Sequence, residues 1–84
     1  MSQHDKLLER LLSRPKEFTW EELKRLLGGF GYEEISSGKA GGSRRRFVHE
    51  ERDPIILHKP HPGNELRRYQ VMQIITHLKV EGII

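Results

Sequence analysis

The spacing of apolar residues changes twice along this chain, and this change limits the possible fold more than any other feature. Up to Gly29 the leucines recur at the spacing of amphipathic helices. From about Gly31 to His58 the residues follow the alternation of β-structure, and helical spacing returns after Asn64. Helices before a small sheet and a helix after it predict an α+β fold.

Two short helices are predicted before the sheet. The leucines predict a first helix over about His4 to Ser13, which Pro15 ends. Thr19 and Glu22 have the spacing of a capping box and predict the start of a second helix. The glycines at 28 and 29 are predicted to end that helix in a left-handed conformation.

The middle of the chain predicts a three-stranded antiparallel meander. Its expected parts are a strand from Tyr32 to Ser37, a turn over Gly38 to Gly42, a strand from Ser43 to Glu50 and a strand from Ile55 to His58. Because side chains alternate along a strand, Arg44 and Arg46 are expected on one face and Arg45 with Phe47 on the other.

A loop and a last helix are predicted after the sheet. Two prolines within Lys59 to Gly63 exclude a helix there, and Gly63 or Asn64 is expected to cap the helix that follows. Its predicted apolar positions are Leu66, Tyr69, Val71, Met72, Ile75 and Leu78, and Gly82 is its predicted end. Trp20 and Tyr69 are expected in the core or in helix packing rather than as base-stacking platforms. The helices are expected on one face of the sheet, which leaves the other face free for a ligand.

Size and composition predict one small intracellular domain over residues 1–84. The chain has 84 residues and no cysteine, which excludes disulfides and thiolate metal ligands. No apolar run has the length of a membrane span, and the N-terminus lacks the pattern of a signal peptide. A soluble, cytoplasmic protein without a membrane partner is therefore expected.

A cluster of cationic residues and histidines indicates a phosphodiester ligand. The net charge is only +3, but the stretch from Lys39 to Arg46 carries four positive charges and no negative one. Three of the five histidines follow, at 49, 58 and 61. Arginine offers a permanently charged fork for phosphate, and histidine exchanges protons near neutral pH.

The histidines differ in how they can approach the arginines. His58 ends the strand expected beside the arginine strand and is the first candidate for proton exchange; His61, held between two prolines, is the second. His49 lies too far along the strand from Arg44 to share a phosphate with it. A turn histidine bonded to backbone is the alternative for each of them, and the histidines lack the carboxylate partner of a metal site.

The chain resembles the HicA toxins of bacterial type II toxin-antitoxin systems. The resemblance rests on the Leu-Leu-Gly-Gly-Phe-Gly-Tyr-Glu run at 26–33, on Gly42-Ser43 with the strand after it, and on the His-Pro-Gly-Asn-Glu-Leu turn at 61–66. It implies a fold similar to a double-stranded-RNA-binding domain. It also implies a ribosome-independent mRNA endonuclease without metal or organic cofactor, and a HicB-type antitoxin protein that neutralises it.

The resemblance also implies a catalytic histidine directly after Gly-Ser, where this chain has Arg44 and Arg45. We therefore expect His58 or His61 to act as the catalytic residue. The RNA contacts are expected from Lys39, Ser43, Arg44, Arg45, Arg46 and Lys59. Two alternatives stay open at this point: a non-catalytic RNA-binding module of the same fold, and a protein-interaction domain whose basic face is covered by an acidic partner.

Overall fold

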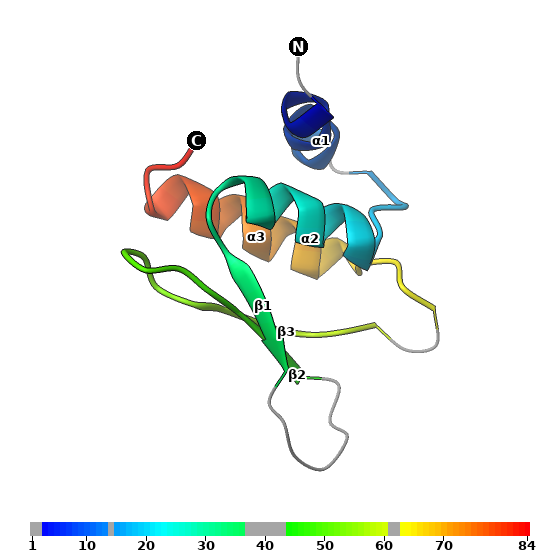
Figure 1. Ribbon diagram of the computed structural model, residues 1–84. Coiled ribbons are helices and arrows are strands. Elements are labelled where there is room, and N and C mark those ends of the chain that lie inside the picture. Colours follow the sequence, from blue (N-terminus) through cyan, green and yellow to red (C-terminus); the bar gives the residue numbers. More distant parts are fainter. Residues whose placement is uncertain (1–2, 14, 37–43, 61–62) are drawn as a thin grey trace.

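The three-stranded sheet expected from the sequence is present in the computed structural model, which describes residues 3–13, 15–36, 44–60 and 63–84 (Figure 1). Its strands β1 (Glu33–Ser36), β2 (Arg44–Val48) and β3 (Ile55–His58) form an antiparallel meander in the order β1-β2-β3. The helices are α1 (Gln3–Leu12), α2 (Trp20–Gly29) and α3 (Arg68–Val80). The predicted α+β fold is confirmed, and the third strand has the predicted bounds.

The helices form two layers above one face of the sheet. Helix α2 contacts β1 and helix α3 contacts β3, so the two helices cover the same sheet face. Helix α1 packs against both of them and lies on the side away from the sheet (Figure 1). None of the helices in the described part of the chain covers the opposite sheet face, as the sequence predicts.

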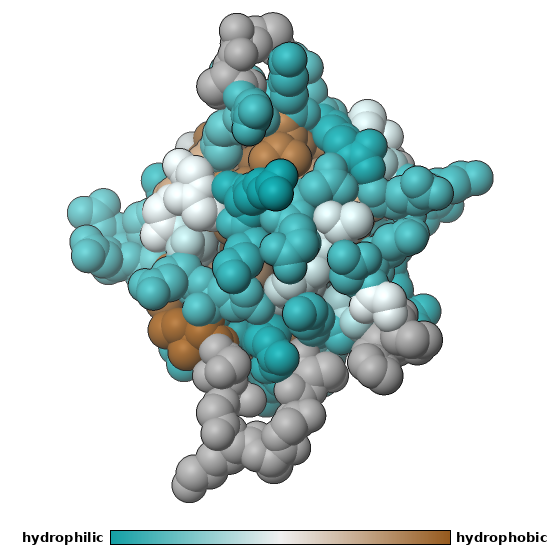
Figure 2. Space-filling model, turned by 45° about the vertical axis from the view of Figure 1, so that its right-hand side comes forward, coloured by the Kyte–Doolittle hydropathy of each residue, from teal (hydrophilic) through white to brown (hydrophobic). Residues whose placement is uncertain are grey.

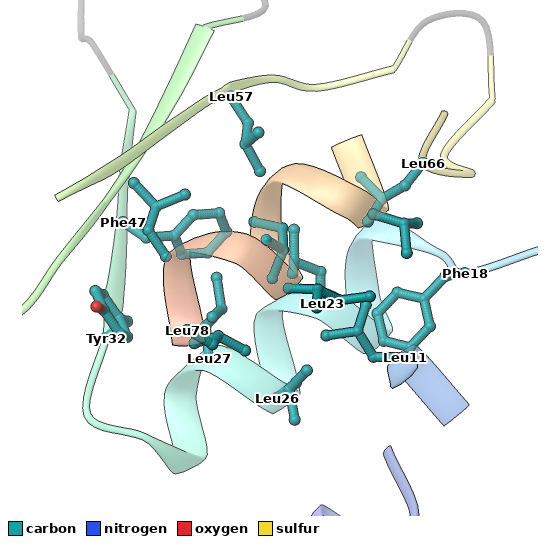
Figure 3. Packing of buried hydrophobic residues seen from close by; sticks show 14 of the residues in the cluster. Leu11, Phe18, Leu23, Leu26, Leu27, Tyr32, Phe47, Leu57, Leu66 and Leu78 are labelled. Atoms are coloured by element: carbon teal, nitrogen blue, oxygen red, sulfur yellow. The ribbon is translucent and has the colours of Figure 1, made fainter. Parts of the chain in front are cut away.

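Buried side chains from all three helices meet the sheet in one hydrophobic cluster (Figure 3). Leu11 of α1 and Leu23, Leu26 and Leu27 of α2 are fully buried there. Phe47 of β2 joins them, and its ring lies 5.5 Å from that of Trp20. Trp20 is therefore a core residue, which confirms the prediction from its spacing.

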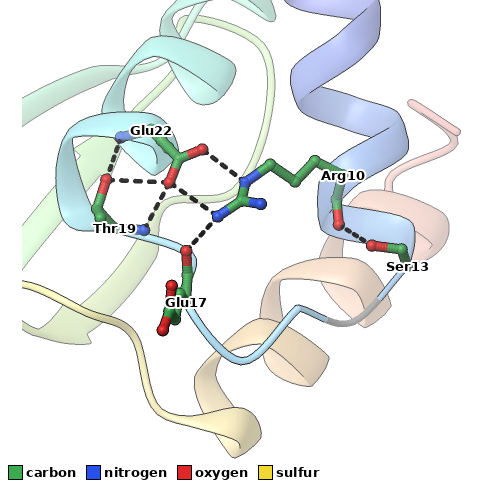
Figure 4. A network of polar contacts seen from close by, with 5 residues as sticks. All are labelled: Arg10, Ser13, Glu17, Thr19 and Glu22. Atoms are coloured by element: carbon green, nitrogen blue, oxygen red, sulfur yellow. Dashed lines mark hydrogen bonds and ion pairs between the residues drawn. The ribbon is translucent and has the colours of Figure 1, made fainter.

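The start of α2 is held by the predicted capping box (Figure 4). The Thr19 hydroxyl accepts a hydrogen bond from the Glu22 backbone N–H at 3.2 Å, and the Glu22 carboxylate accepts one from the Thr19 N–H at 3.1 Å. Arg10 of α1 adds an ion pair to the same carboxylate at 2.7 Å and also bonds the Glu17 carbonyl. The Glu22 carboxylate therefore caps α2 and also anchors α1 through its ion pair with Arg10.

The Glu22 carboxylate makes the stability of this junction depend on pH. Burial alone would raise its pKa, but hydrogen bonds from Thr19 and Arg10 and the charge of Arg10 outweigh burial and hold the pKa below its usual 4.5. A lowered pKa in the folded state stabilises the fold above the unfolded pKa, and this contribution is lost as pH falls through the folded pKa.

We therefore expect Glu22→Gln to lose less stability than the wild type when the pH falls from about 5 to about 3. Urea unfolding followed by circular dichroism at a series of pH values measures this difference. Glu21→Gln is the matched control, because Glu21 is an exposed carboxylate in the same helical turn. Equal pH dependence in the two variants would show that the capping network does not carry the effect.

The end of α2 agrees with the prediction in position but not in conformation. The helix continues through Gly28 and Gly29, and the left-handed residue is Gly31, with φ 99°. The Gly31 N–H bonds the Gly28 carbonyl at 3.1 Å and the Tyr32 N–H bonds the Leu27 carbonyl at 2.9 Å. This is a Schellman motif, and it ends the helix only after Leu26 and Leu27 are buried. The helix thus ends at Gly29, within the predicted pair of glycines, but the predicted left-handed conformation is found at Gly31 instead.

The start of α3 also differs from the prediction, because neither Gly63 nor Asn64 caps it. The Asn64 carbonyl accepts a hydrogen bond from the Trp20 N–H, and the Leu66 N–H bonds the Phe18 carbonyl, both at 2.7 Å. This short bridge requires extended backbone, so the helix begins only at Arg68, after an N-cap at Arg67. Gly82, with φ 75°, follows its C-terminus as predicted.

The later start of α3 selects a different buried stripe. The buried residues of the helix are Gln70, Val71, Ile74, Ile75 and Leu78. Tyr69 is 62% exposed, so the prediction that it belongs to the core or to helix packing was wrong. Tyr69 lies three residues after Leu66, which is the spacing of residues on one face of a helix. Leu66 lies before the helix, however, so this spacing does not place Tyr69 on the buried face of α3.

Candidate nucleic-acid interface

The sheet face without helices carries the exposed arginines of β2. Along this strand Arg44 and Arg46 are exposed and Phe47 is buried; along β3, Ile56 and His58 are exposed and Ile55 and Leu57 are buried. We call this face the open sheet face. Its described side chains are Glu33 and Ile35 of β1, Arg44, Arg46 and Val48 of β2, and Ile56 and His58 of β3.

Strand register places His58 directly opposite Arg44. Side chains opposite one another in an antiparallel pair have Cβ atoms about 4.5 to 5.5 Å apart, so the two are neighbours on the open sheet face. Arg46 lies one row further, between Ile35 of β1 and Ile56 of β3. Two guanidinium groups and one imidazole thus occupy adjacent rows of one exposed surface.

Gln70 of α3 holds the backbone at His58. Its side-chain N–H donates to the His58 carbonyl at 2.8 Å, and its side-chain oxygen accepts from the Arg67 N–H at 3.0 Å. Gln70 is 2% exposed and is the one polar residue in the described segments that is buried. The buried amide therefore links the start of α3 to the end of β3. Because Gln70 is buried, the loss of either hydrogen bond would be costly.

Sequence reasoning missed Gln70, although a signal was present. Gln70 lies four residues before Ile74 and eight before Leu78, so a polar residue stands at an inward position of the helix. A second glutamine, Gln73, donates to the Ile56 carbonyl at 3.4 Å. Together the two amides bond carbonyls of β3 at the side where α3 lies.

Arg45 points to the helix side of the sheet, as the alternation of β2 predicts. Its Nε lies 3.7 Å from the Glu34 carboxylate, which also accepts from the Trp20 indole N–H at 3.0 Å and lies 3.6 Å from the Lys24 ammonium. Glu34 is a second residue that sequence reasoning missed. Arg45 thus differs from Arg44 and Arg46, which extend from the open sheet face.

Three histidines bond to structural partners away from the arginines. The His4 ring lies 2.9 Å from the Leu26 carbonyl, and the His77 ring lies 3.2 Å from the Tyr32 hydroxyl. His49 contacts the Phe30 carbonyl at 3.1 Å and accepts from the Glu51 N–H at 3.0 Å. These contacts indicate that His4, His49 and His77 have structural roles in packing and turns rather than a role beside the arginines.

The remaining predicted site residues lie beside the sheet or outside the described part of the chain. Lys59 directly follows β3 and is half-buried. Lys39, Ser43 and His61 lie outside the described residues. In the segments that are described, no three His, Asp or Glu side chains form a group that could hold a metal ion.

Charge differs between the two ends of the sheet. A hollow of about 600 Å³ at the end away from Arg44 is lined by Gly31, Glu33, Val48, His49, Glu50 and Glu51. Its carboxylates repel phosphate, whereas the end with Arg44 and His58 attracts it. Figure 2 shows one side of the molecule on which hydrophilic residues predominate and hydrophobic residues appear in separate patches. The positive end of the open sheet face is therefore the candidate site for an anionic polymer.

Fold and site define a class of small α+β proteins with a basic sheet face that helices leave uncovered. Residues 20–80 match the model of the family described as the HicA toxin of bacterial toxin-antitoxin. The chain therefore belongs to the HicA toxin family and is a toxin of a toxin-antitoxin system, which implies an antitoxin partner. No curated protein and no solved structure matches it. None of the helices in the described segments could cross a membrane.

Proposed function

We propose that the protein is a metal-independent endonuclease that cleaves mRNA in the cytoplasm and is neutralised by a HicB-type antitoxin. The observation that supports this best is the pair formed by Arg44 and His58 across β2 and β3. It combines a fixed positive charge with a group able to exchange a proton, on a surface that the helices leave exposed.

In the proposed reaction the enzyme removes one proton from the RNA and donates one proton to it. A base takes the proton from the ribose 2′-OH, whose oxygen attacks the adjacent phosphorus; the bond to the 5′-oxygen breaks, and this oxygen leaves with a proton. The products are a 2′,3′-cyclic phosphate and a 5′-hydroxyl. Arginine is too basic to accept the proton, so Arg44 and Arg46 would stabilise the phosphorane charge. His58 is the first candidate for the base, and His61 is the second.

The test of catalysis is incubation of the purified protein with end-labelled single-stranded RNA in excess EDTA. Proton transfer by histidine needs no metal, so we expect cleavage and 2′,3′-cyclic phosphate ends. RNA that stays intact over the whole pH range from about 5 to 9, while binding is retained, would refute the endonuclease.

A non-catalytic RNA-binding module is the second candidate. It is favoured by the arginines at 44 and 45, because the family resemblance implies a catalytic histidine at that place. Such a module would bind RNA with a marked salt dependence and release no product. Intact RNA in the EDTA experiment would select this alternative.

RNA binding is expected to depend more on Arg44 and Arg46, on the open sheet face, than on Arg45, on the helix side. We expect the double variant Arg44→Ala, Arg46→Ala to weaken RNA binding by roughly tenfold or more per arginine, because hydrogen bonds to charged groups contribute about 1.5 to 3 kcal/mol. The salt slope should fall by about 0.7 for each lost phosphate contact with a single strand. Fluorescence anisotropy over a series of salt concentrations measures both quantities.

Arg45→Ala is the matched control for this experiment, since it removes the same charge from the same strand. We expect a smaller change, because Arg45 faces Glu34 on the helix side. A double variant that binds RNA as the wild type does would refute the open sheet face as the RNA site.

The proposed antitoxin is expected to compete for the same surface. An acidic partner segment complements Arg44 and Arg46, and its binding would exclude RNA. Co-expression with the product of the adjacent reading frame tests this. We expect co-purification and loss of cleavage in the complex; an active complex would refute neutralisation by coverage of this face.

A further inference from the structure

Tyr69 is an aromatic side chain on the surface of a protein whose other aromatic residues are in or beside the core. Phe18, Trp20, Tyr32 and Phe47 are buried, and Phe30 is packed against the core. Tyr69, in contrast, is 62% exposed in the first turn of α3. An exposed aromatic ring offers a flat face on which a nucleobase can stack.

Contacts of α3 place Tyr69 on the side of the helix that borders β3. Gln73 lies four residues after Tyr69, and side chains at this spacing share one side of a helix. Gln73 donates to the Ile56 carbonyl, and Gln70, next to Tyr69, donates to the His58 carbonyl. Tyr69 therefore flanks the strand that carries His58.

Two arginines directly precede this ring in the chain. Arg67 and Arg68 precede Tyr69 and are exposed, and the first turn of α3 contains no acidic residue. Glu65, two residues before Arg67, is the nearest carboxylate along the chain. The start of α3 thus adds exposed positive charge beside the edge strand β3, which carries His58. An aromatic ring among cations suits a single-stranded nucleic acid, whose bases stack while its phosphates bind cations.

We propose that the start of α3 is a second part of the RNA site, in which Tyr69 stacks on an unpaired base and Arg67 and Arg68 contact neighbouring phosphates. The inference rests on the proposed function in that RNA is the ligand. It assigns a single strand as the preferred form, because a base within a duplex has no free face for the ring.

The experiment measures the affinity of the full chain for a fluorescent 2′-O-methyl oligonucleotide. This probe lacks the 2′-OH and cannot be cleaved, so binding is separated from catalysis. We expect Tyr69→Ala to weaken single-strand binding roughly 5- to 100-fold, as for other base-stacking aromatics, and Tyr69→Phe to bind within about twofold of the wild type. A blunt duplex of the same sequence should bind Tyr69→Ala and the wild type equally.

Val80→Ala is the matched control, since Val80 is 76% exposed near the far end of the same helix. We expect it to bind like the wild type. The double variant Arg67→Ala, Arg68→Ala should reduce the salt slope by about 1.4, the value for two single-strand phosphate contacts. An unchanged slope would refute the phosphate contacts of α3.

Parallel measurement of Arg44→Ala, Arg46→Ala separates this inference from the proposed function. Normal binding by Tyr69→Ala together with weak binding by the arginine variant would refute the stacking site and leave the proposed function standing. The reverse result would support the stacking site and refute the open sheet face. Equal loss of single-strand and duplex affinity in Tyr69→Ala, or a loss confined to antitoxin binding, would also overturn the stacking proposal.

Discussion

His58→Ala is expected to reduce RNA cleavage by a factor of about 10² to 10⁴, the usual contribution of a general acid or base. RNA affinity should change little, because the proposed phosphate contacts are those of arginines and not of His58. The register of β2 and β3 gives the physical reason, since it brings the imidazole beside the first of these arginines. Single-turnover cleavage in EDTA and anisotropy with the uncleavable probe measure the two quantities.

Two further variants make this result specific. His61→Ala tests the second candidate, and His58→Gln keeps hydrogen-bonding capacity at position 58 but cannot exchange a proton near neutral pH. We expect His58→Gln to be as impaired as His58→Ala. Wild-type rates in both His58→Ala and His61→Ala would contradict the assignment of catalysis to these histidines.

The largest expected effect on stability is that of Trp20→Ala. Trp20 is 1% exposed, packs on Phe47 and donates its indole N–H to Glu34. Loss of a buried tryptophan costs about 3 to 5 kcal/mol, whereas small domains have about 5 to 15 kcal/mol in total. We therefore expect the variant to be largely unfolded or to unfold at a much lower urea concentration. Far-UV circular dichroism is the suitable measurement, because Trp20 is the only tryptophan.

Trp20→Phe and Tyr69→Ala are the controls for this prediction. Trp20→Phe keeps most of the packing but removes the bond to Glu34, so its destabilisation should be smaller. Tyr69→Ala should leave the midpoint nearly unchanged, because that ring is exposed. A Trp20→Ala variant with the wild-type midpoint would argue against the packing of α2 on the sheet.

Local patterns predicted the parts of the fold that depend on neighbouring residues. Thr19 and Glu22 form the capping box because both lie in one helical turn. The faces of β2 follow from strict alternation, which separates Arg45 from Arg44 and Arg46. His58 opposite Arg44 follows from a meander whose third strand has the predicted bounds.

Predictions that depended on distant contacts were less successful. The sequence alone does not show that the backbone of Asn64 and Leu66 bonds to the backbone of Trp20 and Phe18. The apolar pattern therefore predicts a start of α3 that is too early in the chain. For the same reason, helical spacing wrongly predicts Tyr69 in the core or in helix packing. The sequence places the end of α2 at Gly28 and Gly29, where the helix does end, but it does not identify Gly31 as the left-handed residue.

The sequence by itself determined the order of the elements, the arginine-bearing face of β2 and the proximity of His58, because each depends on periodicity or on pairing between consecutive strands. Only the tertiary structure decided which residues of α3 are buried, and thereby that Gln70 holds β3 at His58 and Tyr69 faces solvent. The physical reason is that the backbone bridge between 18–20 and 64–66 sets the start of the helix. Residues far apart in the sequence form this bridge, and no local pattern contains it.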